Sequence, residues 1–392
     1  MYKDNRDIIK KESYDVIVVG GGIAGVSSAV AAARSGASTL LIEKNVNLGG
    51  LATIGLISWY EPLCDGEGKQ MVTGIAEELI KLSAKYSFDN LPEMWGGSGF
   101  NTPKRQRYST NFSPTVFSMV LDEFVLENGV KLRFDTLGTY PVMEDNNCVG
   151  VICESVSGKE FFGAKAVIDA TGTAVVCDRA GMPTEVGENY MSYVAHWFDL
   201  DGMEAFENDK DLCKFRKWMS VGSDLFGNGH PEGMRKLKGV EAEDVTDYVV
   251  YGKKNMLERL KKRDKNSYDI MTLPGMAQFR TIRRIVGEAD FNAVDGETFA
   301  DSIGNTGDFR PFGIGKHYQI PFRALYNSKF SNILAAGRII SSPQGDGWEV
   351  ARVIPTCALT GEAAGKAAAL HALKGYSLDD IAENHIDEIK VN

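Results

Sequence analysis

Hydrophobic and polar positions between residues 14 and 44 follow the order strand, turn, helix, strand. An apolar, β-branched run (VIVV) comes first, and a helix rich in small residues separates it from a second apolar run (TLLI). Three glycines at GxGxxG spacing, Gly20, Gly22 and Gly25, stand between the first strand and the helix. Glu43 ends the second strand, eighteen residues beyond Gly25. This is the order of a βαβ dinucleotide-binding unit.

Each of the three glycines has a mechanical reason to stand where it does. Gly20 permits a tight turn, Gly22 lets the backbone approach a pyrophosphate, and Gly25 lets the helix pack closely on the strand. Phosphates would then meet the unpaired N–H groups of the helix N-terminus. A carboxylate at Glu43 accepts hydrogen bonds from a ribose diol and repels a 2′-phosphate, which favours FAD or NAD over NADP. The alternative is a glycine turn without a ligand, and the flanking strand, helix and Glu43 argue against it.

Beyond this unit the pattern predicts two helices and then changes to period two. The helices are expected over 72–86 and 114–127. After Gly129, four short runs (VKLRFDT, TYPVMED, CVGVICESV and KEFFGA) are typical of strands, and a separate buried run (VIDA) ends at Thr171 and Gly172. We interpret them as an antiparallel β-meander that returns into the first sheet.

The pattern of a nucleotide-binding unit returns near the C-terminus. A buried strand over 333–336 precedes a small-residue helix over about 356–373, which can approach a sheet or a cofactor closely. The stretch 185–310 differs from both ends, because it mixes polar and aromatic residues with long loops. We therefore predict an α/β fold: a Rossmann-like dinucleotide-binding domain from 14–184 and 311–392, with the β-meander inserted in it, and a mixed α+β substrate or cap domain over 185–310.

The composition argues against several classes of protein. A net charge of -10 disfavours nucleic acid and anionic membranes as partners, because both need a basic face. The sequence has no run of eighteen uncharged apolar residues, and its first thirteen residues are too charged for a signal peptide, so we expect a cytoplasmic protein without membrane contact. Its six cysteines form no CxxC pair and no zinc-spaced cluster, which leaves electron transfer to an organic cofactor.

Three arginines stand close together in the segment GMAQFRTIRRIVGEADF. Arg280, Arg283 and Arg284 fall within about one and a half turns of the helix predicted there. Such a group can hold a carboxylate, a phosphate or a neighbouring acidic loop, and structural ion pairing is the commoner use. Shortly before it, the segment GKKNMLERLKKRDK predicts a charged helix whose basic run is a solvated face more often than a binding patch.

Several motifs in one order along the chain resemble a known group of flavoproteins. GGGIAG, Glu43, NLGG, VIDATG, RTIRRIVGEADF and NILAAGR…RVIPTCALTGEAAG resemble the FAD-dependent oxidoreductases of the glutathione-reductase-like superfamily. The nearest resemblance is to the branch that includes heterodisulfide-reductase-like flavoproteins. It covers nearly the whole chain and is weakest over 185–275. It implies a Rossmann-like FAD-binding domain, a noncovalently bound FAD and an oxidoreductase activity.

The resemblance also implies which residues hold the FAD. The glycine turn would take the pyrophosphate, Glu43 and Lys44 the adenosine ribose, and the last helix would direct its N–H groups at the flavin pyrimidine edge. Thr173 departs from the family, which often has an aspartate after ATG, so a contact from that carboxylate is in doubt. The cofactor-binding residues implied are Gly20, Gly22, Ile23, Ala24, Gly25, Glu43, Lys44, Gly49, Gly50, Leu51, Leu137, Ala170, Thr171, Gly172, Gly337, Arg338, Thr356 and Cys357.

Candidates for the chemistry are fewer. Arg352 resembles the arginine that binds a substrate carboxylate in the more distant fumarate-reductase-like flavoproteins; its alternative is an ion pair with Glu349, Asp346 or the flavin. His317 is a candidate for proton transfer, against an ordinary loop or core position. Cys357 lies near a helix N-terminus, where a thiol pKa is lowered, although packing is its alternative. The candidate substrate-binding residues, each with a packing or ion-pairing alternative, are Trp59, Tyr60, His196, Arg283 and Tyr318.

We therefore expect an FAD-dependent oxidoreductase that transfers a hydride between flavin N5 and a small polar substrate, carboxylate-bearing if Arg352 binds it. The alternative is a flavin electron-transfer subunit that passes electrons to a partner redox protein. A tRNA-modifying flavoprotein is disfavoured by the net charge. A single GxGxxG gives no evidence of a second nicotinamide domain. The external electron donor or acceptor is left open among NAD(P)H, a quinone, a carrier protein and oxygen, and so is a homo-oligomer.

Overall fold

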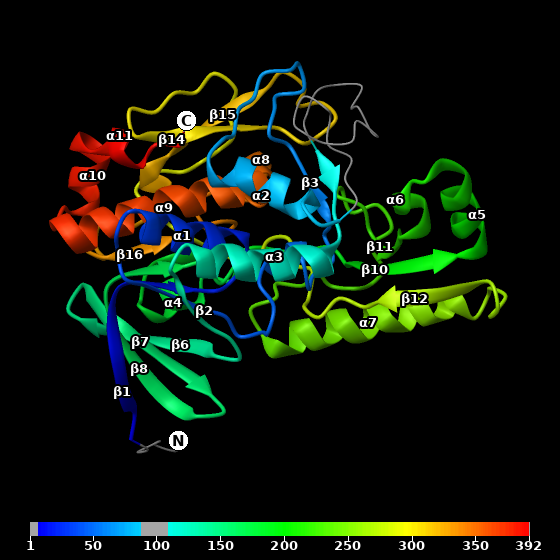
Figure 1. Cartoon of the computed structure of the whole chain (residues 1–392), viewed down its shortest axis with the longest axis horizontal. Helices are drawn as coiled ribbons and strands as arrows, with labels where there is room; N and C mark the ends of the chain where they lie inside the picture. The colour runs from blue at the N-terminus through cyan, green and yellow to red at the C-terminus, as the bar shows by residue number, and fades with distance from the viewer. Residues whose placement is uncertain (1–6, 88–108, 392) are drawn as a thin grey trace.

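A seven-stranded sheet forms the centre of the computed structural model, which describes residues 7–87 and 109–391 (Figure 1). Five of its strands pair in parallel, and the other two are joined to them through antiparallel pairs, which confirms the α/β class. In sheet order they are β5 (Lys131–Arg133), β2 (Thr39–Ile42), β1 (Ile9–Val19), β8 (Gly158–Asp169), β7 (Asn147–Ser155) and β6 (Leu137–Glu144), with β16 (Ile333–Ala335) beside β8.

The β-meander is confirmed in β6, β7 and β8, with two corrections. The run KEFFGA and the run that ends in VIDA are one strand, β8, because Gly163 lets β1 pass close without a break: a Cβ there would overlap the Ser13 hydroxyl. The run VKLRFDT does not join the meander. Its strand, β5, pairs in parallel with β2, with Lys131 beside Leu40, since the helix before it supplies the crossover that a parallel pair needs.

Helices cover one face of this sheet, and Figure 1 shows α1, α3 and α9 stacked there. α1 and α9 approach closely because Gly361 and Gly365 leave room for the α1 backbone: a Cβ at either would overlap a carbonyl oxygen, that of Ala24 or Ser28. Ser113 caps α3, whose predicted bounds are confirmed, while α2 is shorter than expected. The bounds are α1 (Ile23–Arg34), α2 (Ile75–Ala84), α3 (Pro114–Glu127), α4 (Val175–Arg179, on the other face), α8 (Asp346–Ala351) and α9 (Ile354–Lys374).

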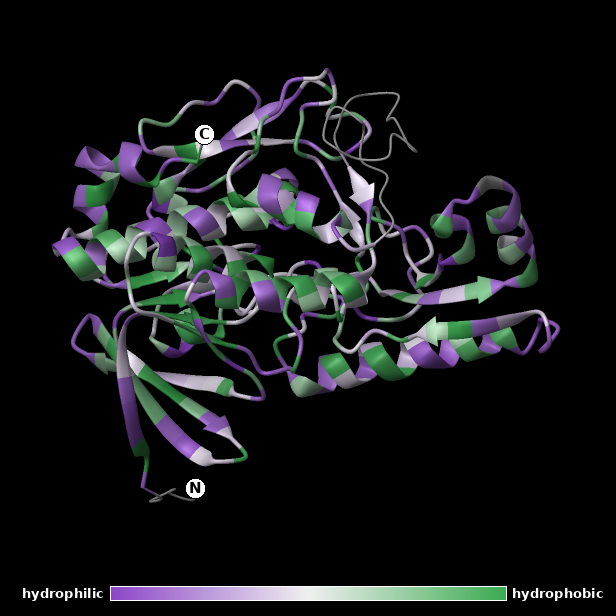
Figure 2. Cartoon of the chain, in the orientation of Figure 1, coloured by the Kyte–Doolittle hydropathy of each residue, from purple (hydrophilic) through white to green (hydrophobic). Residues whose placement is uncertain are grey.

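A second part of the molecule projects to the right in Figure 1. Residues between 191 and 282 form a hydrophobic core of their own, whereas Phe291, Ala293 and Ile303 pack into the core beneath α1 and α9. The charged helix predicted here is α7, and Figure 2 shows hydrophobic and hydrophilic residues alternating along it. The division at 185 and 310 stays a prediction. This part contains β10 (Ser192–Asp199), α5 (Leu200–Asp209), α6 (Leu212–Phe215), β11 (Lys217–Gly222), α7 (Ala242–Leu260) and β12 (Tyr268–Thr272).

The helix predicted around the three arginines does not form. The chain is extended there, and Arg283–Ile285 forms β13, which pairs antiparallel with β9 (Thr184–Val186). The side chain of Asn189 holds the extended form, since its Oδ1 accepts hydrogen bonds from the backbone N–H groups of Arg280 (2.8 Å) and Thr281 (2.9 Å). Tertiary contacts thus override the local spacing.

The remaining elements flank the central sheet. The hairpin of β14 and β15 lies near the C-terminus at the top of Figure 1. No helix within the described ranges is long and apolar enough to cross a membrane. These elements are β3 (Trp59–Tyr60), β4 (Thr110–Asn111), β14 (Ser302–Gly307), β15 (His317–Pro321), α10 (Leu378–Asn384), α11 (Ile386–Ile389) and the 3₁₀ turns Gly50–Ala52 and Phe322–Ala324.

Candidate functional site

A cavity of about 360 Å³ lies beyond the carboxyl ends of the parallel strands. This is where open α/β sheets bind ligands. Its walls come from the three separated segments that the sequence motifs single out, together with Gly239, Val245 and residues between 275 and 282. The predicted cofactor-binding residues that line it are Gly20, Gly22, Ile23, Ala24, Glu43, Lys44, Gly49, Gly50, Leu51, Ala170, Thr171, Gly172, Gly337, Arg338 and Cys357.

The glycine turn after β1 forms one wall of the cavity. Gly20 has φ +104°, and a Cβ there would lie 2.5 Å from the carbonyl oxygen of Ala170. Gly25 packs beneath the turn, where a Cβ would overlap the oxygen of Gly20, so it does not line the cavity. A Cβ at Gly22 would meet nothing within 4 Å. Gly22 caps α1 without a side-chain bond, which leaves the N–H groups of the first turn for an anion.

Glu43 holds the glycine turn against the end of β2. Its carboxylate is buried; Oε2 accepts from the Gly21 N–H (2.6 Å), and Oε1 accepts from the backbone N–H and side-chain amide of Asn45 (2.8 and 2.7 Å). Three of about four acceptor positions are thus taken within the protein. Glu43 keeps room for about one bond from a ribose hydroxyl, and it also fixes the turn, a task that its spacing did not reveal.

Asp169 was missed by the sequence reasoning. Its fully buried carboxylate accepts four hydrogen bonds: Oδ1 from the N–H and hydroxyl of Thr171 (3.0 and 2.6 Å), Oδ2 from the N–H groups of Val176 and Cys177 (2.9 and 3.0 Å). It ties the turn at Thr171 and Gly172 to the start of α4. The aspartate in VIDATG was the available signal, because a carboxylate at a strand end before a turn is suited to such bonds.

Arg338 brings a buried positive charge to the cavity. Its Nε donates to the carbonyl of Gly172 (2.9 Å) and its Nη1 to that of Phe279 (2.5 Å). Burial lowers its pKa to about 10, and among the described residues it makes no ion pair. A buried guanidinium without a carboxylate calls for an anion. Arg338, the uncapped start of α1 and the open space at Gly22 therefore fit a cofactor with a pyrophosphate.

The start of α9 forms another part of the cavity wall. Arg352, Ile354 and Cys357 line the cavity there. Arg352 is ion-paired with Glu349, which was one of the alternatives for this arginine. The expectation of a lowered thiol pKa is wrong, since burial raises the pKa of Cys357 to about 12 and keeps the thiol protonated. Thr356 points away from the cavity: it is buried, with its hydroxyl 2.7 Å from that of Thr306.

Other candidates are also held outside the cavity. Tyr60 is in the core and donates to the carbonyl of Ala76 (2.6 Å), while Trp59 pairs through its backbone with Asn111 on β4. Arg283 is ion-paired with Asp178 (3.0 Å), which is the ion-pairing alternative to a substrate-binding role. Leu137 begins β6 with half of its surface exposed.

The two candidates on β15 do not line the cavity either. Tyr318 donates to the buried carboxylate of Asp308 (2.8 Å), which Arg310 also holds, and burial raises the pKa of Tyr318. His317 carries a buried Nδ1 with no hydrogen-bond partner among the described residues. A proton-transfer role for His317 at this cavity has no geometric support.

His196 is a buried structural histidine rather than a cavity residue. Its Nε2 accepts from the indole N–H of Trp218 (2.9 Å) and lies 3.4 Å from the Ser58 hydroxyl. Burial, and then the charge of Arg216, lowers its pKa to about 4, so it is neutral at pH 7. We expect this neutral side chain to make the fold acid-sensitive.

The loss of stability in acid follows from the difference between the pKa of His196 in the folded chain and its pKa in the unfolded chain. Between about pH 4 and pH 6.5, His196 is protonated in the unfolded chain, where its pKa is near 6.5, but it stays neutral in the folded chain. Stability is therefore complete above about pH 6.5 and falls by up to about 3 kcal/mol as the pH drops toward 4. In urea unfolding at pH 7 and pH 5, the wild type should lose about 2 kcal/mol more than His196→Gln. Equal losses would contradict this assignment.

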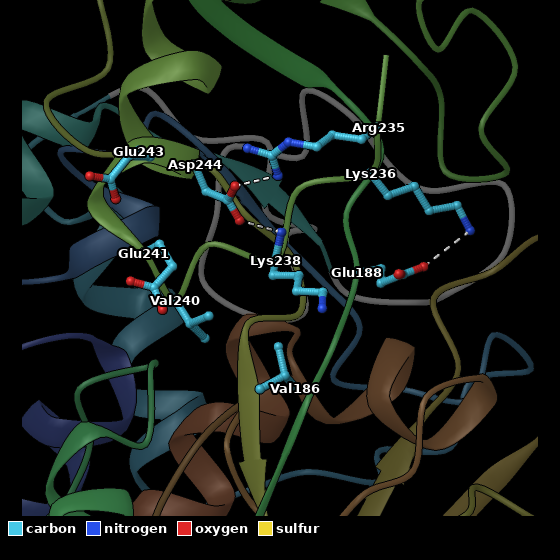
Figure 3. A pocket seen from close by; sticks show the side chains of 9 residues that line it. All are labelled: Val186, Glu188, Arg235, Lys236, Lys238, Val240, Glu241, Glu243 and Asp244. Carbon is cyan, nitrogen blue, oxygen red and sulfur yellow. Dashed lines mark hydrogen bonds and ion pairs between the residues drawn. The ribbon is translucent and has the colours of Figure 1, made fainter. Parts of the chain in front are cut away.

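A larger surface hollow of about 770 Å³ is lined by residues between 186 and 188 and between 235 and 244, at the start of α7 (Figure 3). Its charged residues mostly neutralise one another, since Arg235 pairs with Asp244 (2.5 Å) and Lys236 with Glu188 (3.7 Å). None of the predicted site residues lines it. The motif-lined cavity, although smaller, is therefore the candidate site.

A glycine turn at the carboxyl ends of parallel strands, with a buried arginine facing the same cavity, defines a Rossmann-type dinucleotide-binding protein. The chain belongs to the FAD-dependent oxidoreductase family, which it matches over residues 15–282 and 267–391. It is thus an oxidoreductase with FAD as its cofactor.

Curated relatives are similar over part of their length. They include a fumarate reductase (cytochrome) from Shewanella frigidimarina (27% identity over 191 residues, 41% of this chain and 33% of that protein). Thioredoxin reductase from Bacillus subtilis matches at 28% identity over 95 residues (24% and 30%). The tRNA uridine modification enzyme MnmG of Lactococcus lactis matches at 30% over 185 residues (42% and 25%). The chain thus spans about a third or less of each relative.

Solved structures share the fold along most of the chain. A geranylgeranyl bacteriochlorophyll reductase-like protein from Thermoplasma acidophilum superposes with a TM-score of 0.53 at 15% identity, covering 97% of this chain and 84% of that one. The p-nitrophenol 4-monooxygenase PnpA from Pseudomonas putida gives 0.51 at 14% identity, covering 95% and 83%. At these identities the likeness concerns the fold alone.

Proposed function

We propose that this flavoenzyme transfers a hydride between flavin N5 and a small polar substrate that carries a carboxylate. The observation that carries the proposal is the place of Arg352, which lines the cavity beside Ile354 and Cys357 at the start of α9. The order of the motifs further supports placing the chain in the glutathione-reductase-like superfamily, near its heterodisulfide-reductase-like branch.

The residues of the cavity divide into two groups. The turn at Gly22, with Glu43 and Arg338, would hold the dinucleotide part of FAD noncovalently, and FAD when bound supplies a hydride acceptor or donor at its flavin ring. Arg352 would bind a substrate carboxylate through its planar fork of N–H donors. Its fixed charge would also stabilise negative charge that develops next to that carboxylate.

Residues of the predicted substrate or cap domain line part of the cavity. Gly275 donates its N–H to the carbonyl of Ile54 (2.8 Å), and the Gln278 amide donates to that of Gly55 (2.6 Å). Both acceptors follow the 3₁₀ turn Gly50–Ala52 within three residues. Met276 and Phe279, next to these contacts in the chain, line the cavity. This part of the chain would therefore exclude water from the reacting atoms.

The test of the proposal is anaerobic bleaching of the FAD-loaded protein by matched pairs of small 2-hydroxy or 2-amino carboxylates and their amides. We expect a carboxylate to bleach the flavin and its amide to fail. Arg352→Gln should raise the KM for that carboxylate about 100-fold, because a charge-assisted hydrogen-bonded contact is lost. Arg235→Gln, on the surface hollow, is the matched control.

Two outcomes would contradict the proposal. Equal rates for acid and amide would remove the carboxylate from the substrate class. Bleaching by a reduced carrier protein, with no small molecule active, would favour the electron-transfer subunit instead.

A further inference from the structure

We propose that Glu349 occupies on Arg352 the place of the substrate carboxylate, and that an arriving carboxylate displaces it. The inference rests on the proposed function, because it takes Arg352 as the substrate-binding arginine. It makes Glu349 a built-in competitor of the substrate.

The ion pair between Arg352 and Glu349 is made with a single carboxylate oxygen. Both Nε (3.0 Å) and Nη2 of Arg352 contact Oε2 of Glu349, and Oε1 makes no hydrogen bond with the described residues. The two-oxygen fork geometry, in which each guanidinium nitrogen has its own oxygen, is therefore unused. A free carboxylate that enters the cavity can adopt this two-oxygen geometry. Glu349, which precedes Arg352 by three residues in the chain, contacts it through one oxygen only.

Partial exposure makes the exchange feasible. The side chains of Arg352 and Glu349 retain 17% and 26% of their accessible surface. Ion pairs that keep contact with water contribute little net free energy, so a better-oriented anion can replace one partner. The Glu349 carboxylate, once released, would be hydrated, because its side chain already has contact with water.

The experiment measures acetate binding to the FAD-loaded protein by the flavin absorbance change, at constant ionic strength, with acetamide as the uncharged probe. Glu349→Gln should bind acetate about tenfold more tightly than the wild type, since the internal competitor is gone. Glu241→Gln, an exposed carboxylate on the surface hollow, is the control. Neither the wild type nor any of these variants should bind acetamide.

The outcomes separate this inference from the proposed function. Unchanged or weaker acetate binding by Glu349→Gln would overturn it, because a merely structural Glu349 loosens the site when removed. If that variant fails to fold, Glu349→Asp, which retracts the carboxylate by one methylene, should bind acetate more tightly, and weaker binding would overturn the inference. The proposed function fails on different evidence, namely flavin bleaching that ignores the substrate carboxylate.

Discussion

Gly22→Ala is expected to leave the protein folded but nearly unable to hold FAD, whereas Gly25→Ala is expected to damage the fold itself. The two substitutions add the same methyl group three residues apart. At Gly22 the methyl meets no protein atom within 4 Å and enters the space that a pyrophosphate would need. At Gly25 it overlaps the carbonyl oxygen of Gly20, a backbone atom that cannot step aside without moving the turn.

The two substitutions are expected to change different quantities, the affinity for FAD and the free energy of unfolding. Gly22→Ala should raise the Kd for FAD at least about 100-fold, and the free energy of unfolding of the apoprotein should change by less than about 1 kcal/mol. Gly25→Ala should lower that free energy by about 3 kcal/mol or more, because the core cannot absorb the overlap. FAD titration followed by flavin fluorescence measures the first, and urea unfolding of apoprotein measures the second. FAD binding by Gly22→Ala at wild-type affinity would show that the pyrophosphate does not approach this turn.

The cofactor cavity was predictable because its chemistry is local in sequence. Glycine spacing, a strand before it and an acidic strand end after it impose the same geometry wherever they occur. Most of the residues that the motifs and the family resemblance imply line one cavity. Gly25, Leu137 and Thr356 do not, since Gly25 packs beneath the glycine turn, Leu137 lies at an exposed strand start and Thr356 faces Thr306 inside the fold.

The substrate side was much less predictable. Trp59, Tyr60, His196 and Tyr318 were chosen for their residue type, and local sequence does not say whether a polar aromatic atom will find its partner in the core. Tyr60, His196 and Tyr318 each found one there, with Ala76, Trp218 and Asp308.

The arginine segment failed for a related reason. Its spacing suits a helix, but the side chain of Asn189, some ninety residues earlier, holds it extended. Contacts at such sequence separation leave no trace in periodicity.

Asp169→Asn is expected to lower the free energy of unfolding by at least about 3 kcal/mol, a large part of the stability of an ordinary domain. The carboxylate of Asp169 accepts four hydrogen bonds, two on each oxygen. An asparagine keeps one oxygen and presents an NH₂ group to two donors, so two bonds are lost and donors face each other in a fully buried place. The turn at Thr171 and Gly172, which lines the cavity, loses its anchor on α4.

The loss should therefore appear in two measurements. Urea unfolding of the apoprotein reports the stability, and FAD titration of whatever remains folded reports the displaced turn. Asp295→Asn is the matched control, because Asp295 is exposed and its side chain makes no hydrogen bond or ion pair within residues 7–87 and 109–391. It should change the free energy of unfolding by less than about 0.5 kcal/mol. A small effect of Asp169→Asn would mean that the backbone alone fixes this turn. A large loss of stability with unchanged FAD affinity would separate the anchor from the cavity, since the turn at Thr171 would then keep its shape without the carboxylate that the strand end supplies.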